Sequence, residues 1–369
     1  MIKKICIENF KLFEKLQQEL KPLTLLTGLN GRGKSSFLQA MLVAWGMFED
    51  GGRAFRLSNR YVRLGSLKDI VPWQNGSYEF GITLNVGDSE WSVCNRHFRL
   101  QDGLSDSLGS TYISGYKLDV TQPSDCTLPH LQYLSTYRMG DMQSFPEASE
   151  AVEMKSLSVM NGDGRATAHY MERYGKESVS VLALRSPLSE SARLDDQVNA
   201  WLKIVSPDVD MRVETFGTDY QIRYIPAQSI GNPTVSANAS NVGYGITYAL
   251  PMITAILSSS PGDVVIVETP EAHIHPAGQA RLMDLCSLAA ANGIQVILET
   301  HSDHIVHGVL RNLKKEVLKE DDVAVLFFDK EIDEEQPCIV PQKVTQKGRI
   351  RKPSPGFFDQ YMNDMDALL

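Results

Sequence analysis

One eight-residue segment constrains this chain more than any other, the sequence GLNGRGKS at residues 28–35. It matches the pattern GxxxxGK[ST] at every fixed position. An apolar run at residues 23–27 precedes it, and apolar residues at helical spacing follow it over residues 34–47. A glycine-rich turn that arose by chance would lack these flanks, so we predict a strand, a phosphate-binding loop and a helix.

The chemistry of this loop follows from its residue types. Glycines let backbone N–H groups turn toward the phosphates, and the helix N-terminus adds partial positive charge. Lys34 is expected to reach the β- and γ-phosphate oxygens, and the Ser35 hydroxyl is expected to ligate Mg²⁺. We therefore predict ATP and Mg²⁺ as cofactors. The predicted nucleotide-binding residues of the loop are Gly28, Asn30, Gly31, Gly33, Lys34, Ser35 and Ser36.

A second acidic element follows the wholly apolar run at residues 264–267, which ends in Glu268. Ligands of open α/β sheets lie at the carboxyl ends of the strands, so Glu268 is placed to hold Mg²⁺ together with Ser35, as a Walker B acid does. The alternative is a strand-terminal glutamate without a role. Thr269 follows Glu268 and cannot usefully accept a proton near neutral pH. Glu271 is our candidate for the hydrolytic base, and its alternative role is to cap the following turn.

Histidines follow both acidic elements. His301 comes directly after the next predicted strand, at residues 294–298, where an imidazole can contact the γ-phosphate, although a single histidine is more often structural. We predict a catalytic role for His301. His273 and His275 do not form a set of four metal ligands with suitable spacing, so no zinc site is predicted there.

These elements together resemble the ABC-type ATPases of the SMC, RecF and OLD-nuclease group, and most of all a prokaryotic AAA-like family of stand-alone ATPases found in defence contexts. The segments that carry the resemblance are residues 28–35, YLSTYR at 133–138, NVGYGI at 241–246, ETPEAHIHP at 268–276, ETHSDH at 299–304 and PGFFDQ at 355–360.

The resemblance implies further residues and a partner. Asn241, Gly243 and Gly245 stand where these ATPases keep the signature loop, which contacts the γ-phosphate held by the other subunit. An ATP-dependent homodimer, or a higher oligomer, is therefore expected. From the residues alone, an ordinary helix N-cap is the alternative. The nucleotide-sensing Q-loop residue stays open between Thr136, Gln74 and Arg138.

The function implied by the resemblance is a nucleotide-dependent switch that hydrolyses ATP and controls a partner effector protein in prokaryotic antiviral defence. Because Thr269 follows Glu268, we expect the hydrolysis to be slow. The alternatives are a low-turnover ATP-bound scaffold that sequesters a toxin-like partner, and a DNA-repair ATPase. OLD-type nucleases add a Toprim domain with several acidic metal ligands. This sequence ends at Leu369, soon after His301, and Asp329 and Asp333 alone do not make such a domain, so we expect no nuclease activity.

The predicted fold is α/β, a P-loop NTPase of the ABC-ATPase type with a mostly parallel sheet flanked by helices, an antiparallel β subdomain and an inserted helical or irregular segment. We place the N-terminal part of the ATPase domain at residues 1–138, the insertion at 139–207, the C-terminal part at 208–328 and a tail at 329–369. Residues 341–356 are predicted to be linker-like.

Composition limits the partners. The 369 residues carry a net charge of −9, so nucleic-acid contact requires a local basic patch. Two such patches exist, and solvated loops are the alternative for both: Arg53, Arg56, Arg60 and Arg63, and then Lys343, Lys347, Arg349, Arg351 and Lys352. No apolar run is long enough to span a bilayer, no signal peptide is recognisable, and five scattered cysteines indicate no disulfide framework. We expect a cytoplasmic protein without membrane contact.

Overall fold

The computed structural model describes residues 1–51, 57–65, 69–70, 79–96, 117–123, 127–139, 144–207, 209–226, 237–238, 244–329 and 337–368. The chain forms two compact units. Unit 1 comprises Met1–Lys21, Gly28–Pro129 and Phe327–Val340. Unit 2 comprises Pro22–Thr27, His130–Leu326 and Pro341–Leu369. Each unit is built from segments that are far apart in the sequence.

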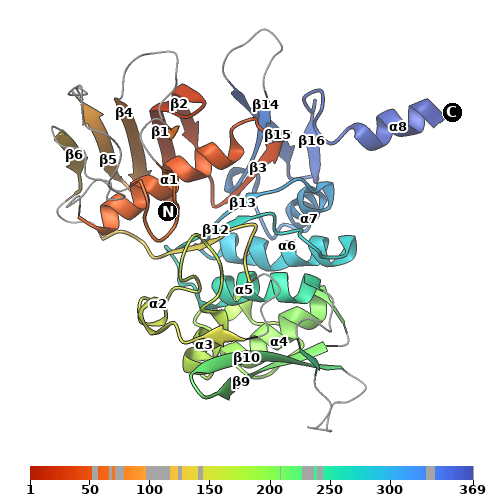
Figure 1. Ribbon diagram of the computed structural model, residues 1–369. Coiled ribbons are helices and arrows are strands. Elements are labelled where there is room, and N and C mark those ends of the chain that lie inside the picture. The colour runs from red at the N-terminus through yellow and green to blue at the C-terminus, as the bar shows by residue number, and fades with distance from the viewer. Residues whose placement is uncertain are drawn as a thin grey trace. The chain divides into compact units, whose positions relative to one another are not determined.

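Unit 1 contains an antiparallel five-stranded sheet in the order β2-β1-β4-β5-β6 (Figure 1). Its strands are β1 (Ile2–Phe10), β2 (Phe13–Glu19), β4 (Phe80–Val86), β5 (Ser89–Arg96) and β6 (Lys117–Thr121). Alternating stretches on both sides of residues 85–89 predict a β-hairpin, and the turn between β4 and β5 lies there. In β4 buried residues alternate with half-buried ones, as expected of a strand with one face against a core. This sheet is the predicted antiparallel subdomain.

Helix α1 (Lys34–Glu49) packs against β1, β4 and β5 in unit 1. It is apolar around most of its circumference, and Phe37, Leu38, Met41 and Trp45 are fully buried. A helix of this kind is stable only inside a core. The rigid packing of α1 therefore fixes its first turn, which the phosphate-binding loop precedes.

Unit 2 is organised around the sheet with strand order β16-β15-β14-β3-β13-β12-β7. The pairs β7–β12, β12–β13 and β13–β3 are parallel, and β15–β16 is antiparallel. The strands are β3 (Leu23–Gly28), β7 (Leu131–Leu134), β12 (Val264–Glu268), β13 (Gln295–Glu299), β14 (Val323–Asp329), β15 (Cys338–Thr345) and β16 (Arg349–Arg351). Because parallel neighbours run in one direction, β12 and β13 end at the same edge of the sheet.

Helices follow the strands of this sheet as βαβ units. Helix α5 (Tyr244–Ser258) packs against β7 and β12, and α6 (Pro276–Ala291) packs against β13 and α7 (Asp303–Lys314). β12 and β13 are almost entirely buried, which explains their continuous apolar sequences. In this region the sequence pattern predicts helices at residues 243–258, 277–291 and 303–315 and strands at 264–267 and 294–298, and all five are confirmed within one residue at each end. The predicted fold class is confirmed.

Residues 144–226 connect β7 to α5 through short elements and a small sheet. The helices are α2 (Ser149–Glu153), α3 (Thr167–Tyr174), the 3₁₀ helix η2 (Leu182–Leu184) and α4 (Leu194–Val205), and the strands are β8 (Phe145–Pro146), β9 (Val209–Phe216), β10 (Asp219–Pro226) and, further on, β11 (Ala237–Asn238). α4 packs against α5 and α6. The Trp201 indole N–H donates to the Leu184 carbonyl (2.8 Å), so this segment has a specific core.

The prediction of a linker over residues 341–356 is wrong. This stretch holds the end of β15 and all of β16. The polar and basic residues of this stretch led to the linker prediction. They are explained by the position of β16 at the edge of the sheet, because charged residues, especially lysine, are common on exposed edge strands. Elsewhere, a short 3₁₀ helix, η5 (Glu320–Asp322), comes before β14. Helix α8 (Gln360–Leu368) ends the described chain (Figure 1). None of the helices among the described residues has the length and hydropathy needed to cross a membrane.

Candidate nucleotide site

The phosphate-binding loop belongs to unit 1, where it forms a turn that requires glycine. Gly28, Gly31 and Gly33 have φ angles of 125°, 74° and 96°. A Cβ atom on Gly28 would lie 2.2 Å from the Phe328 carbonyl oxygen, and one on Gly33 would lie 2.8 Å from the Phe13 ring. Only glycine fits these two positions, so the loop backbone keeps the open cradle that phosphate binding needs.

Lys34 and Ser35 begin α1, with Gly33 as the N-cap. The Lys34 side chain is buried, and its Nζ donates to the carbonyl oxygens of Gly28 and Leu29 (2.8 Å each). This folds the ammonium group over the loop, which is the position that a phosphate-binding lysine requires. Ser35 is exposed at the start of the helix, while Asn30 is exposed in the turn itself. The donor set therefore fits a triphosphate with Mg²⁺.

Glu268 ends β12 in unit 2, and three groups from the end of β7 hold its carboxylate. The Tyr133 hydroxyl donates to Oε1 (2.8 Å), while the Thr136 hydroxyl (3.2 Å) and backbone N–H (3.4 Å) donate to Oε2. Burial, and next the charge of Glu268, raise the pKa of Tyr133 well above its usual value, so this hydroxyl remains a donor. Glu268 is thus oriented by its neighbours in the sheet, as a preorganised metal ligand would be.

The residue after Glu268 has an unusual backbone conformation. Thr269 adopts a left-handed φ of 42°, which a β-branched residue rarely does, at a cost of about 1–3 kcal/mol. Its N–H donates to the Glu299 carbonyl (2.7 Å) and its hydroxyl lies 3.2 Å from the Thr136 hydroxyl. The Thr269 side chain is therefore directed to the end of β7.

Arg138 stabilises this strained turn through hydrogen bonds to its backbone carbonyl groups. Its guanidinium donates to the carbonyl oxygens of Ser135, Tyr248, Glu268 and Thr269 at 3.1, 3.0, 2.7 and 3.0 Å. The side chain is fully buried. Burial lowers the pKa of Arg138 to about 10, against the opposing effect of Tyr248, Glu271 and Glu268, so the group stays cationic at neutral pH. One cation thereby joins the ends of β7 and β12 to the first turns of α5.

Glu271 connects β12 to the end of β13. One carboxylate oxygen accepts from the Thr300 hydroxyl (2.8 Å) and the other from the His301 backbone N–H (2.7 Å). The Glu271 side chain thus bridges to another strand end rather than capping its own turn. His301 is exposed at this edge. Glu268, Glu271 and His301 therefore gather at one end of the parallel sheet of unit 2.

The first turn of α6 gives a structural role to one of the two nearby histidines. His275 is the N-cap, and its Nδ1 accepts from the Ala277 N–H (3.2 Å). His273 stacks at a tilt on Tyr248, with ring centroids 4.8 Å apart. Neither belongs to a group of three potential metal ligands among the described residues.

Of the three predicted signature-loop residues, the structure describes only Gly245. Asn241 and Gly243 lie outside the described residues, as do Gln74, Arg53 and Arg56. Gly245, in the first turn of α5, packs so closely that a Cβ atom would lie 2.4 Å from the His273 carbonyl oxygen. This contact ties the start of α5 to the turn that carries Glu271.

Sequence reasoning found the acids but missed how they are held. Tyr133 was not a candidate, and Thr136 and Arg138 were considered only for the Q-loop. The signal was present, since all three lie in the YLSTYR segment at the end of a buried strand. Their partner Glu268, however, is at least 130 residues away in the sequence.

Family models match three parts of the chain. A model described as "AAA domain, putative AbiEii toxin, Type IV TA system" matches residues 234–307, and a model described as "AAA ATPase domain" matches residues 1–67. A third, described as "Protein of unknown function (DUF3696)", matches residues 318–368. The first two cover the two segments that the predicted nucleotide site requires.

The chain is also similar to a curated protein and to solved structures. The chain is 22% identical over 320 residues to an OLD nuclease of Thermus scotoductus (strain ATCC 700910 / SA-01), which covers 82% of this chain but 59% of that protein. The Smc head bound to the C-winged helix domain of ScpA matches with a TM-score of 0.51 at 14% identity, over 93% of this chain and 97% of that one. A Smc head with an extended coiled coil, bound to the C-terminal domain of ScpA and derived from Pyrococcus furiosus, matches with a TM-score of 0.51 at 12% identity. This match covers 100% of this chain and 99% of that one.

The chain has the fold of the ABC-type P-loop ATPases, as the match to the Smc head shows, and the match to the AAA ATPase model includes its phosphate-binding loop. The family models and the curated relative support a resemblance to the SMC/RecF/OLD-like group of these proteins.

Proposed function

We propose that this protein is an ATP-dependent switch that binds ATP·Mg²⁺, hydrolyses it slowly and controls a partner effector protein. The observation that carries the proposal is the Glu271 bridge. Its carboxylate accepts hydrogen bonds from Thr300 and from the His301 backbone, so the candidate base and the candidate γ-phosphate sensor are mechanically linked. A change at one of these residues is transmitted to the other.

ATP and Mg²⁺ are assigned to two sets of residues. The loop from Gly28 to Ser36 would bind the phosphates, with Lys34 neutralising their charge. Ser35 and Glu268 would hold Mg²⁺, the metal that would offset negative charge developing on the phosphates. The glycine requirement at Gly28 and Gly33 supports the first part, and the orientation of the Glu268 carboxylate supports the second.

Slow hydrolysis follows from Thr269. A neutral hydroxyl cannot serve as a general base, and proton acceptors at this step contribute about 10²- to 10⁴-fold to rates. Glu271 is then the remaining candidate base in this turn. A nucleotide that is turned over slowly maintains one conformation for a long time, which suits a switch better than a motor.

The partner is proposed to be a protein, and dimerisation is proposed to form the complete site. The name of one matched family refers to a toxin of a toxin–antitoxin system, and the matched Smc heads are described as bound to ScpA domains. We assign Asn241, Gly243 and Gly245 to contact with the nucleotide of a second copy. The nuclease activity named for the relative belongs to a protein of which this chain spans 59%, so it is not assigned here.

Isothermal titration with ATP·Mg²⁺ tests the nucleotide site. Lys34→Ala should abolish tight binding, because backbone amides alone do not balance the phosphate charge. Lys15→Ala, an exposed lysine on β2 of the same unit, is the matched control and should bind like the parent. Parent-like binding by Lys34→Ala would show that the loop is misassigned.

Light scattering with a slowly hydrolysed ATP analogue tests dimerisation, and phosphate release separates switch from scaffold. The analogue should increase the mass of the parent protein but not that of Gly243→Asp. Equal masses with and without the analogue would refute the shared site. Phosphate release that stays at background with candidate partners or DNA present would favour the scaffold, and strong salt-dependent stimulation by DNA would favour the repair ATPase.

A further inference from the structure

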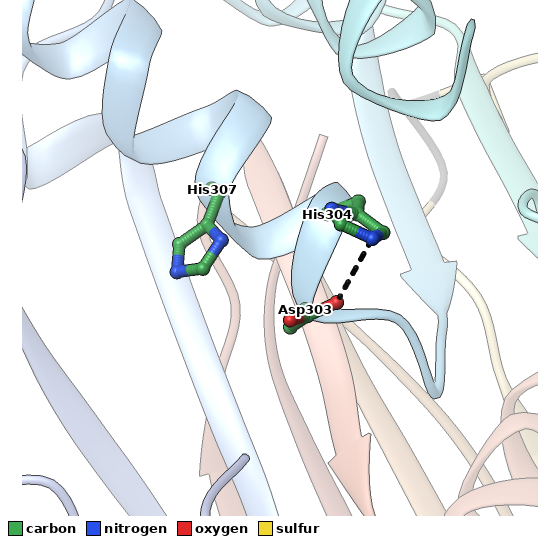
Figure 2. A group of neighbouring side chains, drawn as sticks. All are labelled: Asp303, His304 and His307. Carbon is green, nitrogen blue, oxygen red and sulfur yellow. Dashed lines mark ion pairs between the residues drawn. The ribbon is translucent and has the colours of Figure 1, made fainter. Parts of the chain in front are cut away.

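The first turn of α7 carries three potential metal ligands that the proposed nucleotide site does not use. Asp303, His304 and His307 each offer one ligand atom, and these atoms lie within 4.8 Å of one another (Figure 2). The spacing follows from the sequence DHxxH, because residues three and four apart share one face of a helix. Among the described residues, this is the group of three or more histidine, cysteine or carboxylate side chains whose potential ligand atoms lie this close together.

We propose that Asp303, His304 and His307 bind a divalent first-row transition cation, with Zn²⁺ as the reference ion. Two imidazoles and one carboxylate are donors that suit such ions rather than Mg²⁺ or Ca²⁺. Neighbouring ligands of a tetrahedral ion with bonds of 2.0–2.2 Å lie about 3.3–3.6 Å apart. His304 Nε2 and Asp303 Oδ1 are 3.7 Å apart, close to that separation, and His307 lies within 4.8 Å of both, so its side chain would turn toward the pair when an ion binds.

The surroundings favour access and order. The Asp303 and His304 side chains are about half-exposed, at 45% and 46%, and His307 is exposed, so waters can complete the coordination shell. α7 is a twelve-residue helix whose N-cap, Ser302, accepts from the His304 N–H (3.2 Å). The helix backbone therefore fixes the positions of the three ligand residues, and only their side chains have to turn when the ion binds.

The charge of Asp303 is essential to this site. A helix N-terminus carries partial positive charge, which opposes a cation. The carboxylate of Asp303 offsets it, and so Asp303→Asn should weaken binding even though the amide keeps an oxygen ligand. This expectation distinguishes a metal site from a pair of surface histidines, whose affinity would not depend on the neighbouring acid.

The three ligands lie directly after the segment that holds Glu271. Asp303 follows the two residues, His301 and Ser302, that lead from Thr300 into α7. Thr300 and the His301 backbone hold Glu271. A cation that fixes the first turn of α7 therefore restrains the segment that orients Glu271.

Titration of chelator-treated full-length protein with ZnCl₂, without nucleotide, tests the site. The parent should bind one ion here, and His304→Ala and His307→Ala should each lower the affinity at least about tenfold. His275→Asn is the control, because asparagine preserves the N-cap of α6 while it removes another exposed histidine. Lys34→Ala should bind Zn²⁺ like the parent, so failure of the nucleotide site and failure of this site are distinguishable.

Cobalt supplies a second readout that does not depend on affinity. Co²⁺ bound here should give visible d–d bands without an intense thiolate-to-metal charge-transfer band, because the ligands contain only nitrogen and oxygen. Circular dichroism checks that each variant is folded. Parent-like Zn²⁺ affinity in both His304→Ala and His307→Ala, loss of binding in His275→Asn, or a thiolate band would each overturn the proposal.

Discussion

Replacement of Arg138 by methionine should destabilise unit 2 strongly and loosen the turn that carries the candidate site. The guanidinium donates to four backbone carbonyls, and it is fully buried. Hydrogen bonds from charged donors contribute roughly 1.5–3 kcal/mol each, but contributions within one network are not additive. Breaking a buried charged network by removing one partner typically costs about 3–5 kcal/mol, and we expect a loss in that range.

Two measurements apply to this prediction. Urea unfolding gives the change in stability, and peptide-resolved amide exchange shows where the chain opens. Amides of residues 264–272 and of the first turns of α5 should exchange faster in Arg138→Met. Arg138→Lys should recover only part of the loss, since an ammonium group lacks the planar fork that reaches several carbonyls.

Arg185→Met is the matched control for Arg138→Met. Arg185 lies in the same unit, is half-buried and donates to the Val179 carbonyl (3.0 Å). Its replacement should cost roughly 1 kcal/mol. If Arg138→Met costs no more than Arg185→Met, and exchange at residues 264–272 is unchanged, then Arg138 does not hold the turn.

Two further predictions concern turnover and acid stability. Thr269→Glu should raise the rate of phosphate release about 10²- to 10⁴-fold if the missing base limits hydrolysis, and Glu271→Gln should lower the rate if Glu271 has that role; fast parental turnover that survives both changes would contradict the assignment. Burial is the main cause that lowers the pKa of His169, whose Nδ1 accepts from a backbone N–H (3.1 Å). Stability should therefore be intact above the usual histidine pKa of 6.5 and fall as the pH drops through the lowered value, whereas His169→Gln should show a weaker acid dependence in thermal unfolding.

Local patterns were sufficient where a segment forms its structure with its immediate neighbours. The loop at residues 28–35 and the βαβ units over 243–315 have clear periods, and the structure confirms their elements. A similar signal was overlooked in β14, whose apolar run at residues 323–328 resembles that of β12. β15 and β16 carried no such run, since most of their residues are exposed or half-buried.

The second basic patch shows how an edge strand resembles a loop in sequence. Lys343 and Arg351 are directly opposite each other on β15 and β16, and both are exposed. Like charges opposite each other weaken strand pairing, but they also discourage pairing with another chain. The structure thus replaces the expected solvated loop with a charged edge of the sheet.

The support of the candidate site was beyond sequence reasoning for a different reason. Glu268 was predictable because it ends an apolar strand, but its hydrogen-bond donors come from β7, which is next to β12 only in the folded sheet. Strand order is a tertiary property, and no spacing in the sequence encodes it. The same applies to Thr269, whose left-handed conformation depends on contacts from Glu299 and Arg138.

The hydrogen bonds of Glu271 determine how it can act as a base. An ionised carboxylate has about four lone-pair sites, and the contacts with Thr300 and the His301 backbone use one on each oxygen. Glu271 can therefore accept a proton from water without leaving the bridge. Rotation of the carboxylate toward water would strain both contacts, so the proton acceptor is fixed in direction by the segment that carries His301. Catalysis by Glu271 would then require His301 and its neighbours to be correctly placed, and in this arrangement turnover depends on the same residues that would sense the γ-phosphate.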